Sequence, residues 1–280
     1  MDILLFIKAV IMGIVEGITE FLPISSTGYL ILFGDMMDFW SKDKRDLFIV
    51  VIQLGAILAV IYDYWGRLWS AFMGLLTGRA NGMNSPRGLG GALIIATIPV
   101  MVMGFAFKDL ITTMLFHPLI VATMLIIGAL FIMYVEKRPR PIKVMEAEQM
   151  DFKTALKIGL VQCLALIPGT SRSGATIIGA LWFGASRKAA TEFSFFLGIP
   201  VLVGAALLDL LDKKQALQTG QDWVILGLGV VVSFIVALLC IRFMVTWVSK
   251  RDFMIFAYLR ILTGVVVLLM YFMFGYQVQG

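Results

Sequence analysis

The chain has 280 residues, of which 60% are hydrophobic and 15% are charged, whereas a soluble domain has roughly 45–50% apolar and about 25% charged residues. Apolar runs of about 16–22 residues recur along it, long enough to cross a hydrocarbon layer about 30 Å thick, so the composition predicts a polytopic membrane protein. The formal charge of +5 is then poor evidence for nucleic-acid binding, because Lys and Arg in a membrane protein mainly mark cytoplasmic loops. The single His excludes a His-rich metal centre.

The first apolar segment, residues 8–34, is interrupted by the sequence VEGITEFLPISSTG (15–28). Glu16 and Glu20 are four residues apart in it, so they share one face of a helix. A charge near the bilayer centre costs roughly 2.5–3.5 kcal/mol, so such residues usually mark a functional site; the alternative is a pair near the interface whose side chains reach water. Inside the membrane the two carboxylates are suited to share a divalent cation, or one of them to act as a general acid or base.

A cluster of cap- and turn-forming residues follows Pro23, namely Ser25, Ser26, Thr27 and Gly28. This cluster predicts that a second helix begins here. The start of a helix offers free backbone N–H groups and a positive dipole end, which bind anions, and the hydroxyls add donors or a nucleophile. A plain helix cap is the alternative, but it accounts for one serine and not for three hydroxyls.

Six later segments are predicted to be plain membrane spans: about 47–64, 91–107, 118–135, 190–211, 223–245 and 253–274. Lys and Arg cluster in three of the connecting loops, 65–90, 136–153 and 246–252, which the positive-inside rule assigns to the cytoplasm. Alternating the spans then assigns three other loops to the outside: 35–46, 108–117 and 212–222.

The segment at 154–185 is also apolar but broken, by the sequence PGTSRSGAT. Its turn contains Ser171, Arg172 and Ser173, and Thr176 lies early in the following arm. A guanidinium at a helix start, flanked by hydroxyls, is suited to bind a phosphate group in a bidentate manner. The alternative, in which Arg172 pairs with one of the two glutamates, is compatible with the same site in its empty state.

The two broken segments resemble each other. VEGITEFLPISSTG (15–28) aligns with VQCLALIPGTSRSG (161–174), and VIQLGAI (51–57) shares Leu-Gly with SFFLGIP (194–200). Broken backbone is tolerated at membrane depth only where it is buried in protein or lines a wet cavity. Both segments are therefore predicted to be re-entrant helix hairpins, the first entering from outside and the second from the cytoplasm.

The resulting prediction is an all-α polytopic membrane protein with a single integral membrane domain, residues 1–280. It consists of two inverted-topology repeats, about 8–135 and 154–274, each a re-entrant hairpin plus three transmembrane helices, joined by a cytoplasmic linker at about 136–153. Inverted repeats of this kind place their binding site near the midplane, where the broken helices meet.

Bringing the two tips together gives a pocket with two carboxylates, a Ser/Thr cluster and one Arg, enclosed by apolar helices. An isoprenoid phosphate or another lipid phosphate suits such a pocket. At these residues the chain resembles the undecaprenyl-pyrophosphate phosphatases of bacteria, also called bacitracin-resistance proteins. EGITEFLPISSTG, VIQLGAILAV, PGTSRSGAT and EFSFFLGIP are similar to the motifs of that family and occur in its order over nearly the whole chain.

The resemblance implies hydrolysis of undecaprenyl pyrophosphate to undecaprenyl phosphate and inorganic phosphate, which recycles the lipid carrier for peptidoglycan and cell-wall synthesis and confers bacitracin resistance. It implies a bacterial plasma (inner) membrane location with the site open to the extracytoplasmic side. It also implies a divalent cation, Mg²⁺ or Ca²⁺, for which Glu16 and Glu20 are the candidate ligands. The expected partners are the polyprenyl pyrophosphate and the bilayer but no nucleic acid, and a homodimer stays open.

The candidate catalytic residues are Glu16, Glu20 and Ser26. Ser26 attacks the terminal phosphate or positions a water that does, Glu20 serves as the base, and Glu16 holds the cation or assists. The candidate substrate-binding residues are Ser25, Thr27, Tyr29, Ser171, Arg172, Ser173 and Thr176.

One position departs from the family pattern, because Tyr29 stands where the family usually has His after SSTG. A Tyr has an ordinary pKa of about 10 and is a poor base near neutrality, but it can donate a hydrogen bond to phosphate. The only His in the chain, His117, is predicted to be a surface residue. The alternative function is therefore a lipid-phosphate transporter or a catalytically weakened homologue that binds the polyprenyl phosphate.

Overall fold

The computed structural model describes residues 3–77, 86–107 and 117–274, and every helix or strand element in these ranges is a helix. The α-helices are α1 (Ile3–Thr19), α2 (Ser26–Met36), α3 (Lys42–Asp63), α4 (Trp65–Thr77), α5 (Pro86–Ala106), α7 (Pro118–Lys137), α8 (Phe152–Gln162), α9 (Arg172–Trp182), α10 (Arg187–Lys213), α11 (Gly220–Val248) and α12 (Met254–Phe274). The 3₁₀ turns are η1 (Ala147–Gln149), η2 (Cys163–Leu166) and η3 (Lys214–Ala216).

Within the described ranges, six helices are long and apolar enough to cross a membrane: α3, α5, α7, α10, α11 and α12. They coincide with the six predicted spans, so that prediction is confirmed. Most of the large side chains on their outer faces are apolar, which suits a hydrocarbon surrounding. The chain is a multi-pass, all-helical membrane protein.

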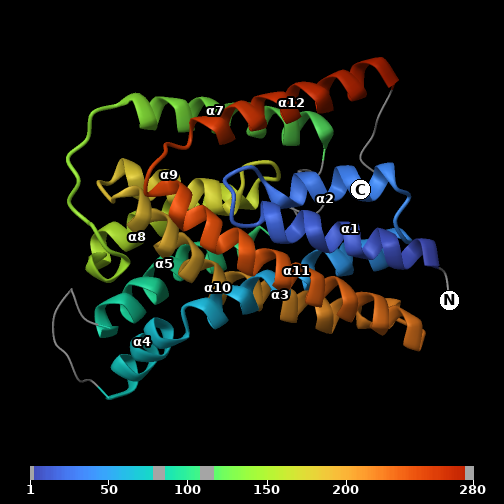
Figure 1. Cartoon of the computed structure of the whole chain (residues 1–280), viewed down its shortest axis with the longest axis horizontal. Coiled ribbons are helices and arrows are strands. Elements are labelled where there is room, and N and C mark those ends of the chain that lie inside the picture. Colours follow the sequence, from blue (N-terminus) through green and yellow to red (C-terminus); the bar gives the residue numbers. More distant parts are fainter. Residues whose placement is uncertain (1–2, 78–85, 108–116, 275–280) are drawn as a thin grey trace.

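Both broken segments fold as two short helices joined by an irregular tip. The first hairpin is α1 and α2, and the second is α8, η2 and α9. Figure 1 shows that α1 and α2 lie at one end of the molecule and α8 and α9 at the other, so the two tips approach each other from opposite ends. The first hairpin begins at Ile3, earlier than predicted, because the apolar run of α1 already starts there.

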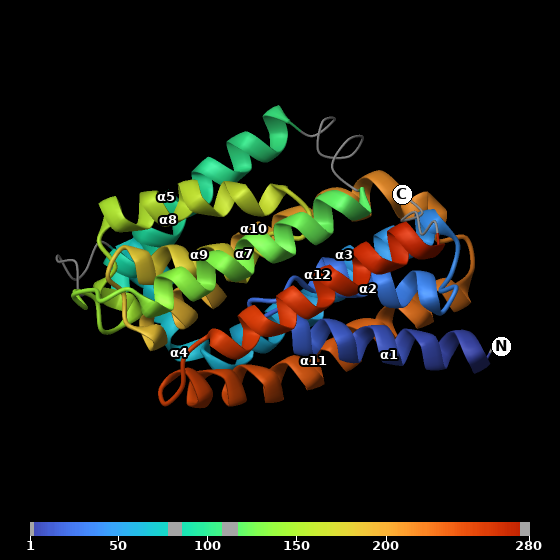
Figure 2. The same cartoon turned by 90° about the horizontal axis from the view of Figure 1, so that it is seen from above.

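Helices of the two halves pack on each other in a reciprocal way. The first arm of the first hairpin, α1, packs on α11, and the first arm of the second, α8, packs on α5. The helices α3 and α10 also contact each other, while α7 and α12 lie side by side in a layer of their own (Figures 1 and 2). Two inverted repeats would give this pattern, and the repeat itself stays a prediction.

The predicted loop at 65–90 is wrong over its first part, where the structure has helix α4. The chain continues from α3 into α4 with only Tyr64 between them, and α4 packs along α5. Ala71 and Gly74 form the buried side of this contact. The basic Arg67 suggested a loop, but the Trp, Leu and Phe residues around it give α4 an apolar face that packs better as a helix.

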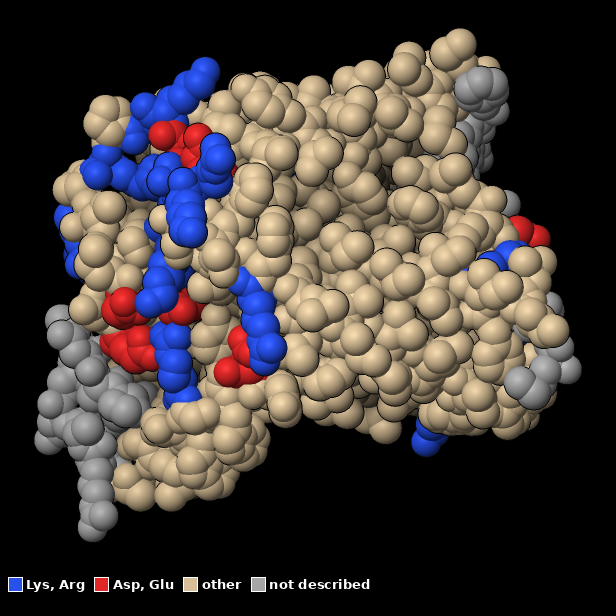
Figure 3. All heavy atoms as spheres, in the orientation of Figure 1, with Lys and Arg blue, Asp and Glu red and all other residues tan. Residues whose placement is uncertain are grey.

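Lys and Arg side chains gather at the end of the molecule where α7 ends and α10 begins (Figure 3). Arg67 joins this region to the linker, since it donates hydrogen bonds of 2.7 and 2.9 Å to Glu148 and one of 3.0 Å to Glu192. Burial raises the pKa of Glu148, but the hydrogen bonds from Arg67, a backbone hydrogen bond and the charges of Arg67 and Lys188 together outweigh burial, so this pKa lies below its ordinary value. The linker is thus held against the helices.

Candidate active site

The tips of the two hairpins have the same unusual backbone. Ser25 precedes α2 with φ 77°, and Ser171 precedes α9 with φ 70°. These are matching positions of the two similar sequences, and both serines have the left-handed backbone that non-glycine residues rarely adopt. Such a conformation costs of the order of 1–3 kcal/mol and persists where the surroundings enforce it, often at functional sites. The strain directs the first turns of α2 and α9 into a shared space.

Arg260 of α12 holds the two tips together. Its guanidinium is fully buried and donates five hydrogen bonds of 3.0–3.1 Å, all to backbone carbonyl groups. One acceptor is Pro23 in the first tip and two, Gly169 and Thr170, are in the second. The other two, Met124 and Leu125, belong to α7. We name this arrangement the tip clamp, since one cation bonds to the carbonyl groups of both tips.

Three predicted residues form one hydrogen-bonded network where the tips meet. The Ser26 hydroxyl donates to Oε2 of Glu20 over 2.6 Å, and Nη2 of Arg172 donates to Oε1 of the same carboxylate over 2.6 Å. Glu20 and Ser26 are only 5% and 8% exposed, so this network is sheltered from solvent. A serine hydroxyl that donates to a buried carboxylate is arranged as a nucleophile beside its base. The alternative in which the side chains of the two glutamates reach water is wrong, because both are buried.

The position of Arg172 is set by α10. Its Nη1 donates to the carbonyl of Ser194 over 2.8 Å, and the Ser194 hydroxyl lies 2.6 Å from that of Thr176. A Cβ atom on Gly198 would lie 2.6 Å from both terminal nitrogens of Arg172, so only glycine leaves room for the guanidinium there. Thr176 is fully buried and is not among the residues lining the pocket, so it supports Arg172 through Ser194.

Glu16 lies one helical turn before Glu20 and is fully buried. Neither of its carboxylate oxygens has a hydrogen-bond partner, and Glu20 and Arg172 are its charged neighbours. A buried carboxylate without partners is costly, so it calls for a proton or a cation. The described residues contain no cluster of three or more His, Cys, Asp or Glu. Mg²⁺ commonly binds through one or two carboxylates, with substrate phosphate and water as its other ligands, so Glu16 and Glu20 fit such an ion.

A pocket of about 290 Å³ opens beside this network. Its polar lining consists of Glu20, Ser25, Ser26, Thr27, Gln53, Ser171, Arg172 and Ser173. Its apolar lining comes from the second tip and from the spans α5 and α10, including Val100 and Leu202. A charged and hydroxylated floor under apolar walls suits a ligand with a phosphate head and a hydrocarbon chain.

Tyr29 is placed differently from its predicted role. Its hydroxyl lies 2.6 Å from that of Thr263 on α12, and Tyr29 is not among the pocket-lining residues. Tyr29 on α2 is thus directed toward the neighbouring span α12, where its hydroxyl has Thr263 as its partner. His117 is exposed and caps α7 by accepting from the backbone N–H of Leu119, so its prediction as a surface residue is confirmed.

Comparison with known proteins agrees with this geometry. The family model of the bacitracin resistance protein BacA matches residues 9–266. The chain belongs to this family. An undecaprenyl-diphosphatase of Psychrobacter arcticus is 70% identical over 280 residues, which is all of both chains. Undecaprenyl-diphosphatase 1 of Acinetobacter baylyi is 56% identical over 269 residues, covering 96% of this chain and 97% of the relative. Undecaprenyl-diphosphatase 2 of Rhodospirillum rubrum is 52% identical over 268 residues, 96% of each chain.

Three residues of this BacA family member that matter to the site were missed in the sequence. Arg260 stands in an apolar run with no motif around it, and the carbonyl groups it binds come from three separate segments. Gln53 and Gly198 lie in the Leu-Gly segments that indicated the repeat, but nothing in those segments showed that one lines the pocket and the other receives Arg172. A lone Arg in the middle of a predicted span was the one available signal, because intramembrane charges usually have a function.

Proposed function

We propose that this chain is an undecaprenyl-diphosphatase, which hydrolyses undecaprenyl pyrophosphate to undecaprenyl phosphate and inorganic phosphate. The observation that carries the proposal is the buried network in which Glu20 accepts from Ser26 and from Arg172, inside a pocket with apolar walls. Membership of the BacA family and three relatives named undecaprenyl-diphosphatase support the choice of substrate.

Substrate binding begins with an exchange of partners at Arg172. In the structure its Nη2 bonds to Glu20, and an entering terminal phosphate replaces that carboxylate as the stronger, doubly charged acceptor. The hydroxyls of Ser171 and Ser173 line the same pocket beside Arg172. The Ser173 hydroxyl donates to the carbonyl of Leu22 over 3.0 Å, so it exchanges this acceptor for the phosphate, and the positive dipole end of α9 favours the same anion. Arg172 thereby releases one oxygen of Glu20 and increases the basicity of that carboxylate.

The chemical step then uses the pair of Ser26 and Glu20. The Ser26 Oγ attacks the terminal phosphorus while its proton passes to Glu20 Oε2, which lies 2.6 Å away. The anhydride P–O bond breaks, and undecaprenyl phosphate leaves with the bridging oxygen and its electron pair. Water next attacks the phosphorus of the serine phosphate, and the bond between phosphorus and Ser26 Oγ breaks. Glu20 returns its proton to Oγ, which regenerates Ser26, and the protons of the attacking water leave with the inorganic phosphate. Arg172 stabilises the charge on the transferred group in both steps.

A divalent cation is part of the proposal. Glu16 and Glu20 would hold Mg²⁺ or Ca²⁺, and the two unpartnered oxygens of Glu16 support this choice. When bound, such an ion neutralises negative charge on the pyrophosphate. Its test has a readout besides activity: Mg²⁺ or Ca²⁺ should raise the melting temperature of the parent in detergent, and Glu16→Gln should abolish that increase.

The proposed setting is the bacterial plasma membrane, with the pocket open to the extracytoplasmic side and a role in carrier-lipid recycling, cell-wall synthesis and bacitracin resistance. The positions of the pocket residues support this orientation. α10 begins at the end where Lys and Arg gather, and its pocket-lining residues Val201, Leu202 and Ala205 come in its second half. The positive-inside rule makes the Lys- and Arg-rich end cytoplasmic.

The test is phosphate release from undecaprenyl pyrophosphate by the purified chain in detergent, with Mg²⁺, with Ca²⁺ and with a chelator. Arg172→Ala should lower turnover by about two orders of magnitude or more, and Glu20→Gln should have a comparable effect. Near-normal turnover of either variant would contradict the assigned roles. Tyr29→His should leave turnover within about threefold of the parent, since the tyrosine hydroxyl bonds to Thr263 and is not at the network.

The lipid-carrier alternative is an outcome of the same experiment. If the parent moves a labelled undecaprenyl pyrophosphate across proteoliposomes and releases no phosphate, the chain is a carrier and the proposed reaction is wrong. If Tyr29→His then gains phosphate release, the family's usual residue is required for hydrolysis and the present chain is a weakened phosphatase.

A further inference from the structure

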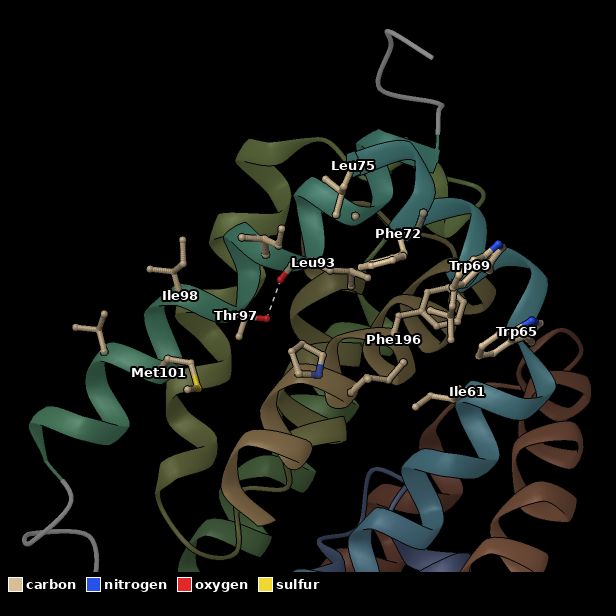
Figure 4. A pocket seen from close by; sticks show the side chains of 17 residues that line it. Ile61, Trp65, Trp69, Phe72, Leu75, Leu93, Thr97, Ile98, Met101 and Phe196 are labelled. Carbon is tan, nitrogen blue, oxygen red and sulfur yellow. Dashed lines mark hydrogen bonds between the residues drawn. The ribbon is translucent and has the colours of Figure 1, made fainter. Parts of the chain in front are cut away.

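A second cavity of about 750 Å³ lies between α4, α5 and α10, outside the catalytic network. Figure 4 shows Trp69 and Phe72 of α4 pointing toward α10, whereas Ile98 lies on the outer side of α5. The only hydroxyl among the described lining residues belongs to Thr97, and it is already used, because it donates to the carbonyl of Leu93 over 2.7 Å. The cavity therefore offers almost nothing to a polar ligand, and its volume is in the range of about 300–1,000 Å³ typical of ligand sites.

This cavity is an open groove, which we name the α4–α5 groove, and aromatic residues and a close helix contact at one end shape its walls. On α4, the rings of Trp65 and Trp69 stack at 5.6 Å with an interplanar angle of 14°, and Phe72 continues the row 5.8 Å from Trp69. Near Leu75 the helices α4 and α5 come together, since a Cβ on Gly90 would lie 2.7 Å from the Leu75 side chain. From there α4 and α5 diverge and leave the groove open (Figure 4).

The groove and the catalytic pocket meet along the contact between α5 and α10. On α5, Val100 lines the catalytic pocket while the next residues, Met101 and Val102, line the groove. On α10, Pro200 lines the groove while the next residue, Val201, lines the catalytic pocket. Adjacent residues of a helix face directions about 100° apart, so these two helices form the shared wall of both spaces. The catalytic pocket and the groove therefore lie on the two sides of the contact between α5 and α10.

We propose that this groove binds the isoprenoid chain of the substrate whose pyrophosphate is held at Arg172. The inference rests on the proposed function and extends it to the binding of the lipid tail. The hydrocarbon of an isoprenoid is stabilised in this open apolar groove by van der Waals contacts with its lining, and the flat faces of Trp65 and Trp69 match its planar double-bonded units. An acyl chain of an ordinary phospholipid is the competing occupant, and the test below distinguishes the two.

The kinetic test fills the groove at Thr97. Thr97→Phe adds a ring to the groove, whose lining also includes Phe72 and Phe196. The matched control is Val231→Phe on α11, because Val231 is half exposed and lines neither cavity. KM and kcat are measured for undecaprenyl pyrophosphate and for farnesyl pyrophosphate, a short-chain analogue with the same head group. Thr97→Phe should raise KM about tenfold or more for the long substrate and change kcat/KM for the short one less than about twofold. Val231→Phe should leave both the KM for the long substrate and the kcat/KM for the short one unchanged.

Equal effects on both substrates would mean that Thr97→Phe distorts the catalytic pocket. No effect on either substrate would mean that the groove does not hold the tail. Each of these results overturns the proposal. If the parent hydrolyses neither substrate, the proposed function fails, and labelling decides the groove separately. A photoreactive undecaprenyl phosphate with its diazirine on the isoprenoid chain should label α4 at Trp65–Phe72. Excess unlabelled undecaprenyl phosphate should suppress this labelling, whereas suppression by phosphatidylethanolamine to the same degree would overturn the assignment.

Discussion

The tip clamp predicts that adding a single methyl group on α7 disables the site. A Cβ on Gly128 would lie 2.1 Å from Nη2 of Arg260 and 2.7 Å from its Cζ, distances that real Cβ atoms do not show. Gly128→Ala therefore displaces the guanidinium, and the two hydrogen bonds of Nη2, to Met124 and Gly169, are lost. The Met124 carbonyl keeps its bond within α7, but the Gly169 carbonyl and the displaced Nη2 donor are both left unsatisfied. Each such buried group costs about 1–3 kcal/mol, so the loss of stability is about 2–6 kcal/mol.

Part of this loss falls on the second tip, where Gly169 stands three residues before Arg172. A tip that is less well held weakens the alignment of Arg172 with Ser26, and turnover should fall more than about tenfold, which corresponds to about 1.4 kcal/mol in the activation free energy. The assay is thermal unfolding in one detergent together with kcat on the same preparation.

The matched control is Gly227→Ala on α11, where an added Cβ meets no atom within 4 Å. It should leave kcat unchanged and slightly raise the melting temperature, because Ala is favoured over Gly in a helix interior by about 1 kcal/mol. Parent-like stability and turnover for Gly128→Ala would refute the reasoning, since the methyl group would then have been accommodated without moving Arg260.

Two further substitutions test other parts of the structure. Gly198→Ala should lower kcat about tenfold or more by displacing Arg172. Gly204→Ala on the same helix should not lower kcat, because its Cβ would lie 3.8 Å from the nearest atom. The assay is steady-state phosphate release by both variants. Glu148→Gln should cost at most about 1 kcal/mol at neutral pH, because its ion pair with Arg67 is partly exposed. The folded pKa of Glu148 is depressed, so the pair stabilises the protein above the ordinary carboxyl pKa and ceases to do so as pH falls through the folded value. Melting temperatures measured from neutral to acidic pH should therefore fall less steeply for Glu148→Gln than for the parent, and parallel curves would contradict this role.

The sequence predicted the spans and the residues of the network, but not how several of them are supported. Hydropathy alone located six helices, since a hydrocarbon layer imposes a minimum apolar length. Glu20, Ser26 and Arg172 were identified because polar residues are rare at membrane depth and these occur at the two breaks. The helix α4 was missed because a basic residue and two glycines obscured its apolar face.

Other features depend on packing that no local pattern encodes. Thr176 was predicted to bind substrate, but its hydroxyl lies 2.6 Å from that of Ser194. It therefore supports Arg172 indirectly, because the Ser194 carbonyl accepts a hydrogen bond from Arg172. Tyr29 was assigned to the pocket by its place after the serines, yet the position of α12 gives its hydroxyl a partner in Thr263. Partners that come from distant segments become visible only when the helices are assembled.

The tip clamp also has a consequence for the order in which the protein is made. A ribosome produces the first tip at the beginning of the chain, but the Arg260 that bonds to its Pro23 carbonyl belongs to α12, the last helix of the described chain. Until α12 inserts, the carbonyl groups of both tips lack this donor, and fewer contacts maintain the strained backbone conformations of Ser25 and Ser171. The catalytic centre is therefore completed only after α12 has been translated and inserted, so a chain truncated before α12 would insert most of the described helices and still have no working site.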